Sequence, residues 1–365
     1  MRIPFFPSRT MAFYLGKAFL IRTVAVLAML VVVLTSLDLL GESGKILAVP
    51  GNGSEEVWRY LGLRIPQIIS RFLPFSVLLG TLITLATLNQ NSEVISMKAA
   101  GMSAHQILAP LILTGALVAL ISFGFNERVV TRSTAALSKW QKVEYQPVPK
   151  DSLVKSNVWV RDGANLIHAR LVTGKSPNLI LNDVTVYDRT SGALDQIISA
   201  RGAVAQPGGG WEVVDANQFN VKTGVYTPIG SIHVAKGVSP DQFTLINVDP
   251  DSLSVEPLRS AITELKKAGR PYAALEGALW HKFSGPMSAV LMPLLGAVAA
   301  FGLARSGKLF VRAVIGMALG FAYFVADNFA IAMGDLGAYP PWLSAWGPFF
   351  LFLLIGELVL IRTEE

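Results

Sequence analysis

The sequence predicts an α-helical membrane protein with six transmembrane helices, three on each side of an inserted all-β domain. Apolar residues make up 52% of the chain and charged residues only 15%. Soluble domains carry about 25% charged residues, so this composition is typical of a membrane protein. The apolar residues gather in runs that are long enough to cross a bilayer, which takes about 20 residues. Roughly 160 residues of soluble composition lie between the third and fourth runs, which is enough for a separate core.

The apolar runs divide the chain into three parts. The first run is too long for a cleaved signal peptide and is not followed by a clear small-residue cleavage site, which predicts a retained signal anchor. The predicted spans are Phe19–Leu40, Leu61–Leu88, Ile107–Phe125, Pro286–Ala304, Leu309–Met333 and Trp342–Ile361. The predicted domains are an N-terminal membrane half at 1–125, a soluble domain with connecting helices at 126–283, and a C-terminal membrane half at 284–365.

Lys and Arg residues beside the spans predict the orientation, because cytoplasmic loops carry an excess of them. Arg2, Arg9 and Lys17 precede the first span, with Arg22 at its edge. Arg305 and Lys308 separate the fourth span from the fifth, with Arg312 just inside the fifth, and Arg362 follows the sixth. The loop between the fifth and sixth spans has Asp335 and no Lys or Arg. We therefore expect both termini and the 89–106 loop in the cytoplasm, and the inserted domain across the membrane. The net charge of +6 then reflects topology, and no nucleic-acid partner is expected.

The inserted stretch alternates apolar and polar residues with period two from about residue 153 to 245. A hairpin is expected over 158–171, and turn-rich breaks separate further short strands. About seven to nine strands at this spacing predict a sandwich or a jelly roll. The period then changes, and Pro257–Ala268 predicts an amphipathic helix, followed by a helix over Tyr272–Phe283 that leads into the fourth span. The chain has no cysteine, so the domain has no disulfide, which is compatible with a bacterial periplasm.

The loop between the second and third spans is the most informative segment. Asn91 or Ser92 can cap the start of a short helix through a side-chain oxygen. Glu93 stands in the first turn, where the helix dipole favours a carboxylate, and Gly101 is placed to end the helix in a left-handed conformation. A helix of about eight residues is marginal by itself in water. Either the rest of the chain or a partner must therefore hold it.

Three further local signals concern helix starts and helix packing. Ser103 and Gln106 have capping-box spacing, so the next helix is expected to begin at once. Gly316 and Gly320 form a GxxxG pair in the fifth span, which permits close helix packing. Asp327 in the same span is expected to be a buried structural partner.

The sequence contains no apparent catalytic set. The four histidines are scattered along the chain: His105, His168, His233 and His281. No zinc-protease or hydrolase motif is present, and no cysteine is available to bind a metal. Gly302–Lys308 fits the first part of a phosphate-binding loop, but Leu309 stands where Ser or Thr is needed, and the segment follows a membrane span. We expect no enzyme activity, metal or cofactor, so a powered function would need a partner's ATP.

Polar residues inside the spans form two stripes at helical spacing. One stripe lies in the second span and consists of Arg64, Gln67 and Arg71. The other lies at the outer end of the first span and consists of Thr35, Asp38, Glu42 and Lys45. One interpretation is snorkelling or ion pairing within the bundle. The other is a lateral cleft in which Arg binds a phosphorylated lipid headgroup. The candidate headgroup-binding residues are Asp38, Lys45, Arg64, Gln67 and Arg71.

Four segments resemble the LptF/LptG family of lipopolysaccharide export permeases, and the resemblance covers nearly the whole chain. They are Asn91–Gly101 in the first loop, Asn157–Val172 at the entry to the insert, Val248–Ser254 at its exit, and Trp280–Phe283 before the fourth span. The exit segment and the hairpin around Trp159 look most like the LptG subunit. The resemblance implies six spans in the bacterial inner membrane, both termini in the cytoplasm, and a periplasmic β-jelly-roll domain.

The resemblance also implies the function of a permease subunit that extracts lipopolysaccharide from the inner membrane and passes it to a periplasmic bridge. The implied partners are a homologous F-type permease subunit, a dimeric cytoplasmic ABC ATPase and a single-span periplasmic C-type jelly-roll protein. Residues 89–101 resemble the coupling helix that docks into the ATPase. Glu93 is the position carried over from the family, and its neighbours in this role are Ser92, Val94, Met97 and Gly101.

The sequence departs from the family at the outer part of the first span, where G subunits can carry lysines that face the substrate. Here the stretch holds Thr35, Gly41 and Glu42, with Lys45 as the nearest cation. The alternative function is a non-transporting membrane scaffold that anchors an ATPase and a periplasmic partner. A secondary transporter, the third class, predicts spans interrupted at the midplane in both halves, and the prolines of the second span have no matching pair in the other half.

Overall fold

The structure is a computed structural model, and it describes residues 8–147, 155–175, 178–189, 192–206, 210–235, 237–238, 240, 243, 249–267, 271–302 and 309–364. The chain divides into two compact units. The helical unit comprises Met1–Gln146, Pro250–Ile262 and Pro271–Glu365, and the β unit comprises Pro147–Asp249 and Thr263–Arg270. The polypeptide thus leaves the helical unit for the β unit and returns to it, as expected for an inserted domain.

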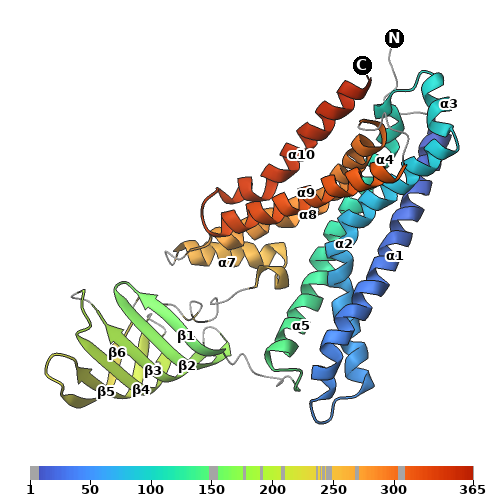
Figure 1. Ribbon diagram of the computed structural model, residues 1–365. Helices are drawn as coiled ribbons and strands as arrows, with labels where there is room; N and C mark the ends of the chain where they lie inside the picture. The colour runs from blue at the N-terminus through green and yellow to red at the C-terminus, as the bar shows by residue number, and fades with distance from the viewer. Residues whose placement is uncertain are drawn as a thin grey trace. The chain divides into compact units, whose positions relative to one another are not determined.

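Long helices dominate the helical unit (Figure 1). The helices are α1 Arg9–Leu47, α2 Ser54–Gln90, α3 Glu93–Ala99, α4 Ala104–Phe125, η1 Asn126–Val130, α5 Thr131–Lys142, η2 Pro250–Ser252, α7 Val255–Lys267, α8 Ala273–Ala297, η3 Val298–Gly302, α9 Leu309–Asp335 and α10 Pro341–Glu364. Six helical segments of the described residues are long and apolar enough to cross a membrane, which confirms the six predicted spans. With 39 residues, α1 is about 60 Å long and exceeds a hydrocarbon core of about 30 Å.

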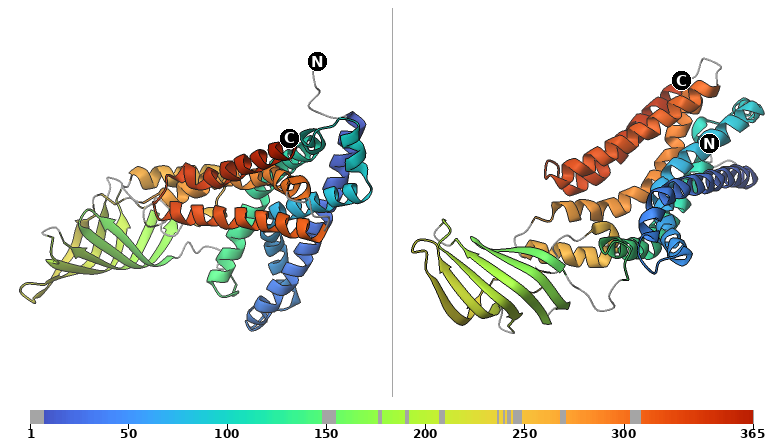
Figure 2. Two further views of the ribbon diagram at one scale, coloured as in Figure 1. Left: turned by 45° about the horizontal axis from the view of Figure 1, so that its top comes forward. Right: turned by 60° about the horizontal axis from the view of Figure 1, so that its bottom comes forward.

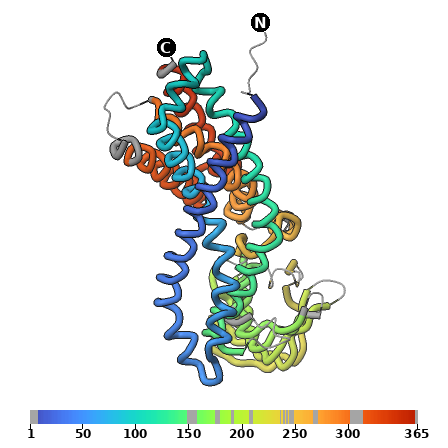
Figure 3. Tube along the Cα trace, turned by 90° about the vertical axis from the view of Figure 1, so that its right-hand side faces the viewer, coloured from blue at the N-terminus to red at the C-terminus, as the bar shows by residue number. Residues whose placement is uncertain are grey.

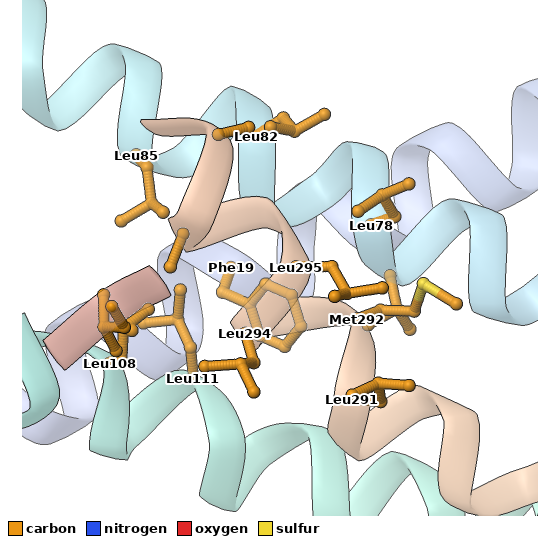
Figure 4. Close-up of a cluster of buried hydrophobic side chains, with 14 of the residues drawn as sticks. Phe19, Leu78, Leu82, Leu85, Leu108, Leu111, Leu291, Met292, Leu294 and Leu295 are labelled. Atoms are coloured by element: carbon orange, nitrogen blue, oxygen red, sulfur yellow. The ribbon is translucent and has the colours of Figure 1, made fainter. Parts of the chain in front are cut away.

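Buried apolar side chains of α1, α2, α4 and α8 form the main core of the helical unit (Figure 4). The side chains labelled in the figure are Phe19, Leu78, Leu82, Leu85, Leu108, Leu111, Leu291, Met292, Leu294 and Leu295. Val94 and Met97 of α3 belong to the same cluster. The short loop helix is therefore packed onto the helices that would cross the membrane.

Small residues let these helices approach closely. A Cβ atom at Gly115 of α4 would lie 2.6 Å from the carbonyl oxygen of Ala289 in α8, so no larger residue fits there. The side of α9 that carries Gly316 and Gly320 packs against α2, where a Cβ at Gly320 would clash with the Leu78 side chain. The GxxxG pair thus serves helix packing within this chain.

The helical unit has two ends with different features. The start of α1, the helix α3 and the end of α10 lie toward one end, which we call the α3 end (Figures 1 and 3). The turn at 48–53 between α1 and α2 lies toward the other, which we call the hairpin end. An even number of spans brings both termini of the unit to the same end.

The β unit contains one antiparallel sheet (Figure 2). Its strands are β1 Lys155–Asp162, β2 Asn165–Lys175, β3 Asn178–Asp188, β4 Gln196–Ala205, β5 Trp211–Asn220 and β6 Tyr226–Val234. The inserted all-β domain is confirmed, and the expected hairpin is β1–β2, in which Asp162 pairs with Asn165. The described strands number six instead of seven to nine, and each pairs with the next in chain order. This meander differs from the two Greek keys of a jelly roll in the strict sense.

A line of charged residues crosses the middle of the sheet. Arg170, Asp183, Arg201 and Asp215 stand at equivalent positions on β2 to β5, with one ion pair between Arg170 and Asp183 and another of 3.7 Å between Arg201 and Asp215. Asp183 and Asp215 have φ angles of 50° and 57°, so the chain turns locally at both. Buried residues alternate on each side of this line but are three positions apart across it. The apolar face therefore stays inward on both sides, although the period of two is broken.

The helix α7 confirms the amphipathic helix predicted after the strands. Its apolar side chains Leu258, Ile262 and Leu265 are buried. At its start, the backbone N–H of Val255 donates a hydrogen bond of 2.6 Å to the Glu127 carboxylate of η1. The helix α8 follows and runs unbroken into the fourth span, also as predicted.

Candidate functional site

The helix α3 has the predicted position but not the predicted start. Ser92 adopts a left-handed conformation with φ 60°, and its side chain makes no capping hydrogen bond. The side-chain amide of Asn91 instead donates to Oε1 of Glu93 at 3.4 Å, so the expected side-chain cap is wrong. Gly101 has φ +84°, which confirms the left-handed end of the helix. The reciprocal capping box of Ser103 and Gln106 is also confirmed.

The rest of this chain holds α3 in place. Val94 and Met97 are each 4% exposed and lie in the main core. The opposite side of the helix is open, and Ile95 on it is 62% exposed. Of the candidate coupling residues, Ser92 and Gly101 are exposed, Glu93 is half-buried, and Val94 and Met97 point into the core. Val94 and Met97 therefore attach the helix to the core. Ile95, which no sequence pattern pointed to, is the exposed apolar side chain of α3.

Glu93 is bound by a residue from the first span. The hydroxyl of Tyr14 in α1 lies 3.2 Å from Oε1 and 3.1 Å from Oε2 of Glu93. A hydroxyl has one proton, so the two oxygens share a single donor. A carboxylate can accept about four hydrogen bonds, and Glu93 therefore keeps free acceptor capacity. No sequence signal joined residues that are 79 positions apart.

The last turn of α3 contacts the second half of the helical unit. The ammonium of Lys98 lies 5.3 Å from the centroid of the Phe301 ring in η3. This distance is within the range of a cation–π interaction. The loop helix is thus attached at its start to α1 and at its end to the continuation of α8.

At the hairpin end, Arg64 is paired inside the chain. Its Nε lies 3.1 Å from Oδ2 of Asp38, its Nη2 lies 2.8 Å from Oδ1, and its Nη1 lies 2.8 Å from Oε1 of Gln67. The hydroxyl of Tyr60 donates a further bond of 2.5 Å to Asp38. Three of the five candidate headgroup residues therefore use their charges and hydrogen bonds on each other, which is the ion-pairing interpretation of the stripe.

A second polar contact lies beside this pair. Glu42 accepts a hydrogen bond of 2.6 Å from the hydroxyl of Tyr145 and forms an ion pair of 2.8 Å with Lys45. Burial, followed by the hydrogen bond to Glu42, raises the pKa of Tyr145 to about 12. Tyr145 packs in a cluster with Ile46, Tyr60, Leu137 and Trp140. The start of α2, the end of α1 and the segment after α5 are thus bound together.

Arg71 differs from the other candidates. Its side chain is exposed on α2, and among the described residues it has no hydrogen-bond or ion-pair partner. Lys45 is the other accessible candidate cation, with a side chain that is 66% exposed, although Glu42 pairs with it. If a phosphate binds to this unit, these two cations are available without breaking the Asp38–Arg64 pair.

Asp327 is only 9% exposed and lies 4.0 Å from Nε2 of His281, consistent with the predicted buried structural partner. Within the part of the chain that the structure describes, no group of three His, Asp or Glu residues could hold a metal ion. Most of the phosphate-loop-like segment, 303–308, lies outside the described residues.

These features define a class of protein: a polytopic membrane protein with three spans on each side of an inserted antiparallel β domain and a short helix between its second and third spans. The family model of the lipopolysaccharide export system permease LptF/LptG matches residues 13–362. The chain therefore belongs to this family.

Individual relatives carry the name of one of the two subunits. The chain is 26% identical over 314 residues to LptG of Escherichia coli strain K12, which covers 84% of this chain and 85% of that protein. It is 24% identical over 336 residues to LptG of Haemophilus influenzae, which covers 86% of this chain and 89% of that protein. The predicted likeness to the G subunit is confirmed.

Proposed function

We propose that this chain is a transmembrane subunit of an ABC-type export complex that extracts lipopolysaccharide from the inner membrane and passes it to a periplasmic bridge. Membership of the permease family is the main support. A separate dimeric ATPase in the cytoplasm would supply the energy, and a homologous F-type subunit and a single-span C-type protein would complete the complex. In this arrangement both termini are cytoplasmic, and the domain within 126–283 is periplasmic, in agreement with the distribution of Lys and Arg.

The helix α3 is the proposed docking element for the ATPase. The single observation that supports this best is the two-sided character of α3: one side is buried in the chain's own core, and the other exposes Ile95 to 62%. Glu93 borders the exposed side and keeps acceptor capacity for a donor from another chain. An exposed apolar side chain, with a partly satisfied carboxylate at the border of the same exposed side, is a chemically specific surface for a partner.

The charge reversal Glu93→Lys tests this docking element. We expect a folded protein that loses the ATPase or binds it without export, because the carboxylate would be replaced by a cation. Glu55→Lys is the matched control, since Glu55 is also an acidic residue in the first turn of a helix but lies at the hairpin end. The measurements are copurification of the ATPase with the tagged chain and ATP-dependent release of lipopolysaccharide. Normal values of both for Glu93→Lys would reject the docking role.

Lipid binding is proposed to use the accessible cations Arg71 and Lys45, with the Asp38–Arg64–Gln67 group as a fixed support. An Arg in a spanning helix that has no partner among the described residues is expected to face a cavity, an anionic ligand or another subunit. We expect Arg71→Leu to lower the lipopolysaccharide that copurifies with the complex, and Arg71→Lys to retain most of it, because a phosphate is attracted by either cation. If both variants retain as much lipopolysaccharide as the unmodified complex, Arg71 is excluded from the binding site.

The scaffold alternative is favoured by one observation, the internal pairing of Arg64, which explains a polar stripe without any lipid. Photo-crosslinkers at position 71 and at Trp159, whose side chain is 48% exposed, distinguish the two functions. Lipopolysaccharide adducts at either position support transport. Adducts at neither position, in a complex that still contains the ATPase, support the scaffold.

A further inference from the structure

We propose that α3 is a two-point linkage in which Tyr14 and Lys98 are positioning residues that connect the docking surface to the first and fourth spans. This inference rests on the proposed function, because it describes how a movement of α3 would reach the spans. The two contacts lie at opposite ends of one short helix, and they join elements from the two different halves of the helical unit.

The first contact connects α3 to α1. Tyr14 donates its hydroxyl to Glu93, the first residue of α3. Its neighbour Leu15 and, one turn later, Phe19 are fully buried in the main core, so the segment of α1 that carries Tyr14 is held firmly. Tyr14 itself is 49% exposed. The Tyr14 hydroxyl is therefore a direct polar contact between the candidate docking carboxylate and a rigid part of the first span.

The second contact connects α3 to α8. Lys98 stands in the last turn of α3, and its ammonium lies over the ring of Phe301 in η3, which directly continues α8. The helix η3 has π-helical hydrogen bonding and is therefore a local irregularity of this span. A displacement of Lys98 would thus act on an irregular part of the fourth span.

The apolar side of α3 does not provide such directional contacts. Val94 and Met97 are surrounded by side chains of the main core, and apolar contacts of this kind hold α3 against the bundle without being directional. The polar contacts at the two ends define the direction in which α3 is held. A pull on the exposed side would therefore be passed directionally to α1 and η3 through these two contacts, in addition to the core packing that holds α3.

The test compares four variants of the complete complex, purified with its copurifying subunits and reconstituted in phosphatidylethanolamine vesicles that contain lipopolysaccharide. Tyr14→Phe removes only the hydroxyl, and Lys98→Met removes the cation. The matched controls are Tyr339→Phe, in the loop before α10, and Lys17→Met, an exposed cation of α1. The readout is the amount of lipopolysaccharide released for each ATP hydrolysed. We expect this ratio to fall about two- to tenfold in the first two variants only, with the ATPase still bound.

A conservative variant and a second measurement separate a linkage from simple loss of structure. Lys98→Arg keeps a cation over the ring and should restore the ratio. Because the chain has no cysteine, spin labels can be placed at Phe13→Cys and Ala99→Cys alone. The distance distribution between these labels should broaden in Tyr14→Phe and stay unchanged in Tyr339→Phe, even in the isolated detergent-solubilised chain.

The outcomes distinguish the two hypotheses. No ATP-dependent release by the unmodified complex would reject the proposed function, whereas the label distances would still decide whether Tyr14 links α1 to α3. An unchanged release ratio together with an unchanged label distribution in Tyr14→Phe would overturn the linkage and leave the proposed function intact.

Discussion

Two charged side chains at opposite ends of the helical unit, Arg64 and Glu93, are held in different ways. Arg64 directs three nitrogens to Asp38 and Gln67, and Asp38 receives a further hydroxyl from Tyr60. Glu93 shares one hydroxyl proton from Tyr14 and has a long contact of 3.4 Å to Asn91. Both side chains looked like functional candidates in the sequence.

The difference teaches how a scaffold charge is separated from a binding charge. Hydrogen-bonding capacity that is used inside the chain stabilises the fold, and a ligand could reach it only by breaking those bonds. Capacity that remains free at a partly exposed site is available to a partner. By this criterion we propose that the Asp38–Arg64 pair stabilises the fold and that Glu93 is part of the proposed docking surface.

The largest expected effect is on the scaffold pair. Asp38→Ala removes the acceptor of two Arg64 nitrogens and of the Tyr60 hydroxyl, leaving Arg64 only its bond to Gln67, and should lower the free energy of unfolding by about 2–3 kcal/mol. Arg71 is exposed and lies in α2, the helix that also carries Arg64, and Arg71→Leu should change the free energy of unfolding by less than about 0.5 kcal/mol. Thermal unfolding of the solubilised chain, followed by circular dichroism, measures both. Equal losses of stability would remove the distinction between Arg64, which is paired, and Arg71, which has no partner among the described residues.

The next largest loss of stability is expected at the end of α3. Gly101→Ala places a side chain at φ +84° with no neighbouring atom in the way, so its cost of about 1–2 kcal/mol is purely conformational. Gly124→Ala is the matched control, because Gly124 also has open space around its Cα but lies within the helix α4, where Ala is favoured. A stability loss for Gly124→Ala as large as that for Gly101→Ala would contradict the left-handed end.

Glu93→Gln should change stability least among the charged sites. The amide oxygen can still accept the Tyr14 hydroxyl, and the group is partly exposed, so we expect a change below about 0.5 kcal/mol. Export should nevertheless fall, because the charge offered to a partner is lost. If the variant unfolds as readily as Asp38→Ala, Glu93 belongs to the scaffold.

The smallest change in stability at neutral pH is expected at Tyr145, whose contribution appears as a pH dependence. Its pKa is raised from 10.0 to about 12, so the folded state favours the protonated hydroxyl. This contribution to stability is fully present below pH 10 and is lost as the pH rises through about 12. Tyr145→Phe should remove this fall in stability at high pH, because the variant has no hydroxyl to titrate, while Tyr339→Phe should leave it unchanged. Unfolding transitions recorded between neutral pH and pH 12, with tyrosinate absorbance as a second signal, provide the measurement. A pH dependence that is the same in both variants would contradict the Tyr145–Glu42 contact.

Local pattern was sufficient for the spans, for α3 and for the capping box of Ser103 and Gln106. These features depend on residues within one or two helical turns of each other. The expected cap at Asn91 or Ser92 was wrong because Ser92 adopts a left-handed conformation. Among the described strands, β5 continues through Asp215, where the left-handed conformation shifts the alternation of buried residues, so the pattern there looked like a break between strands.

The sequence by itself determined the class of this protein: six apolar runs, an alternating insert and a short loop helix with Glu93 in its first turn. These properties follow from hydrophobicity and local backbone preference. Only the tertiary structure decided which charges are used internally and which remain free. The pair Asp38–Arg64 spans 26 positions and the pair Tyr14–Glu93 spans 79, and contacts at such separations depend on how the helices pack.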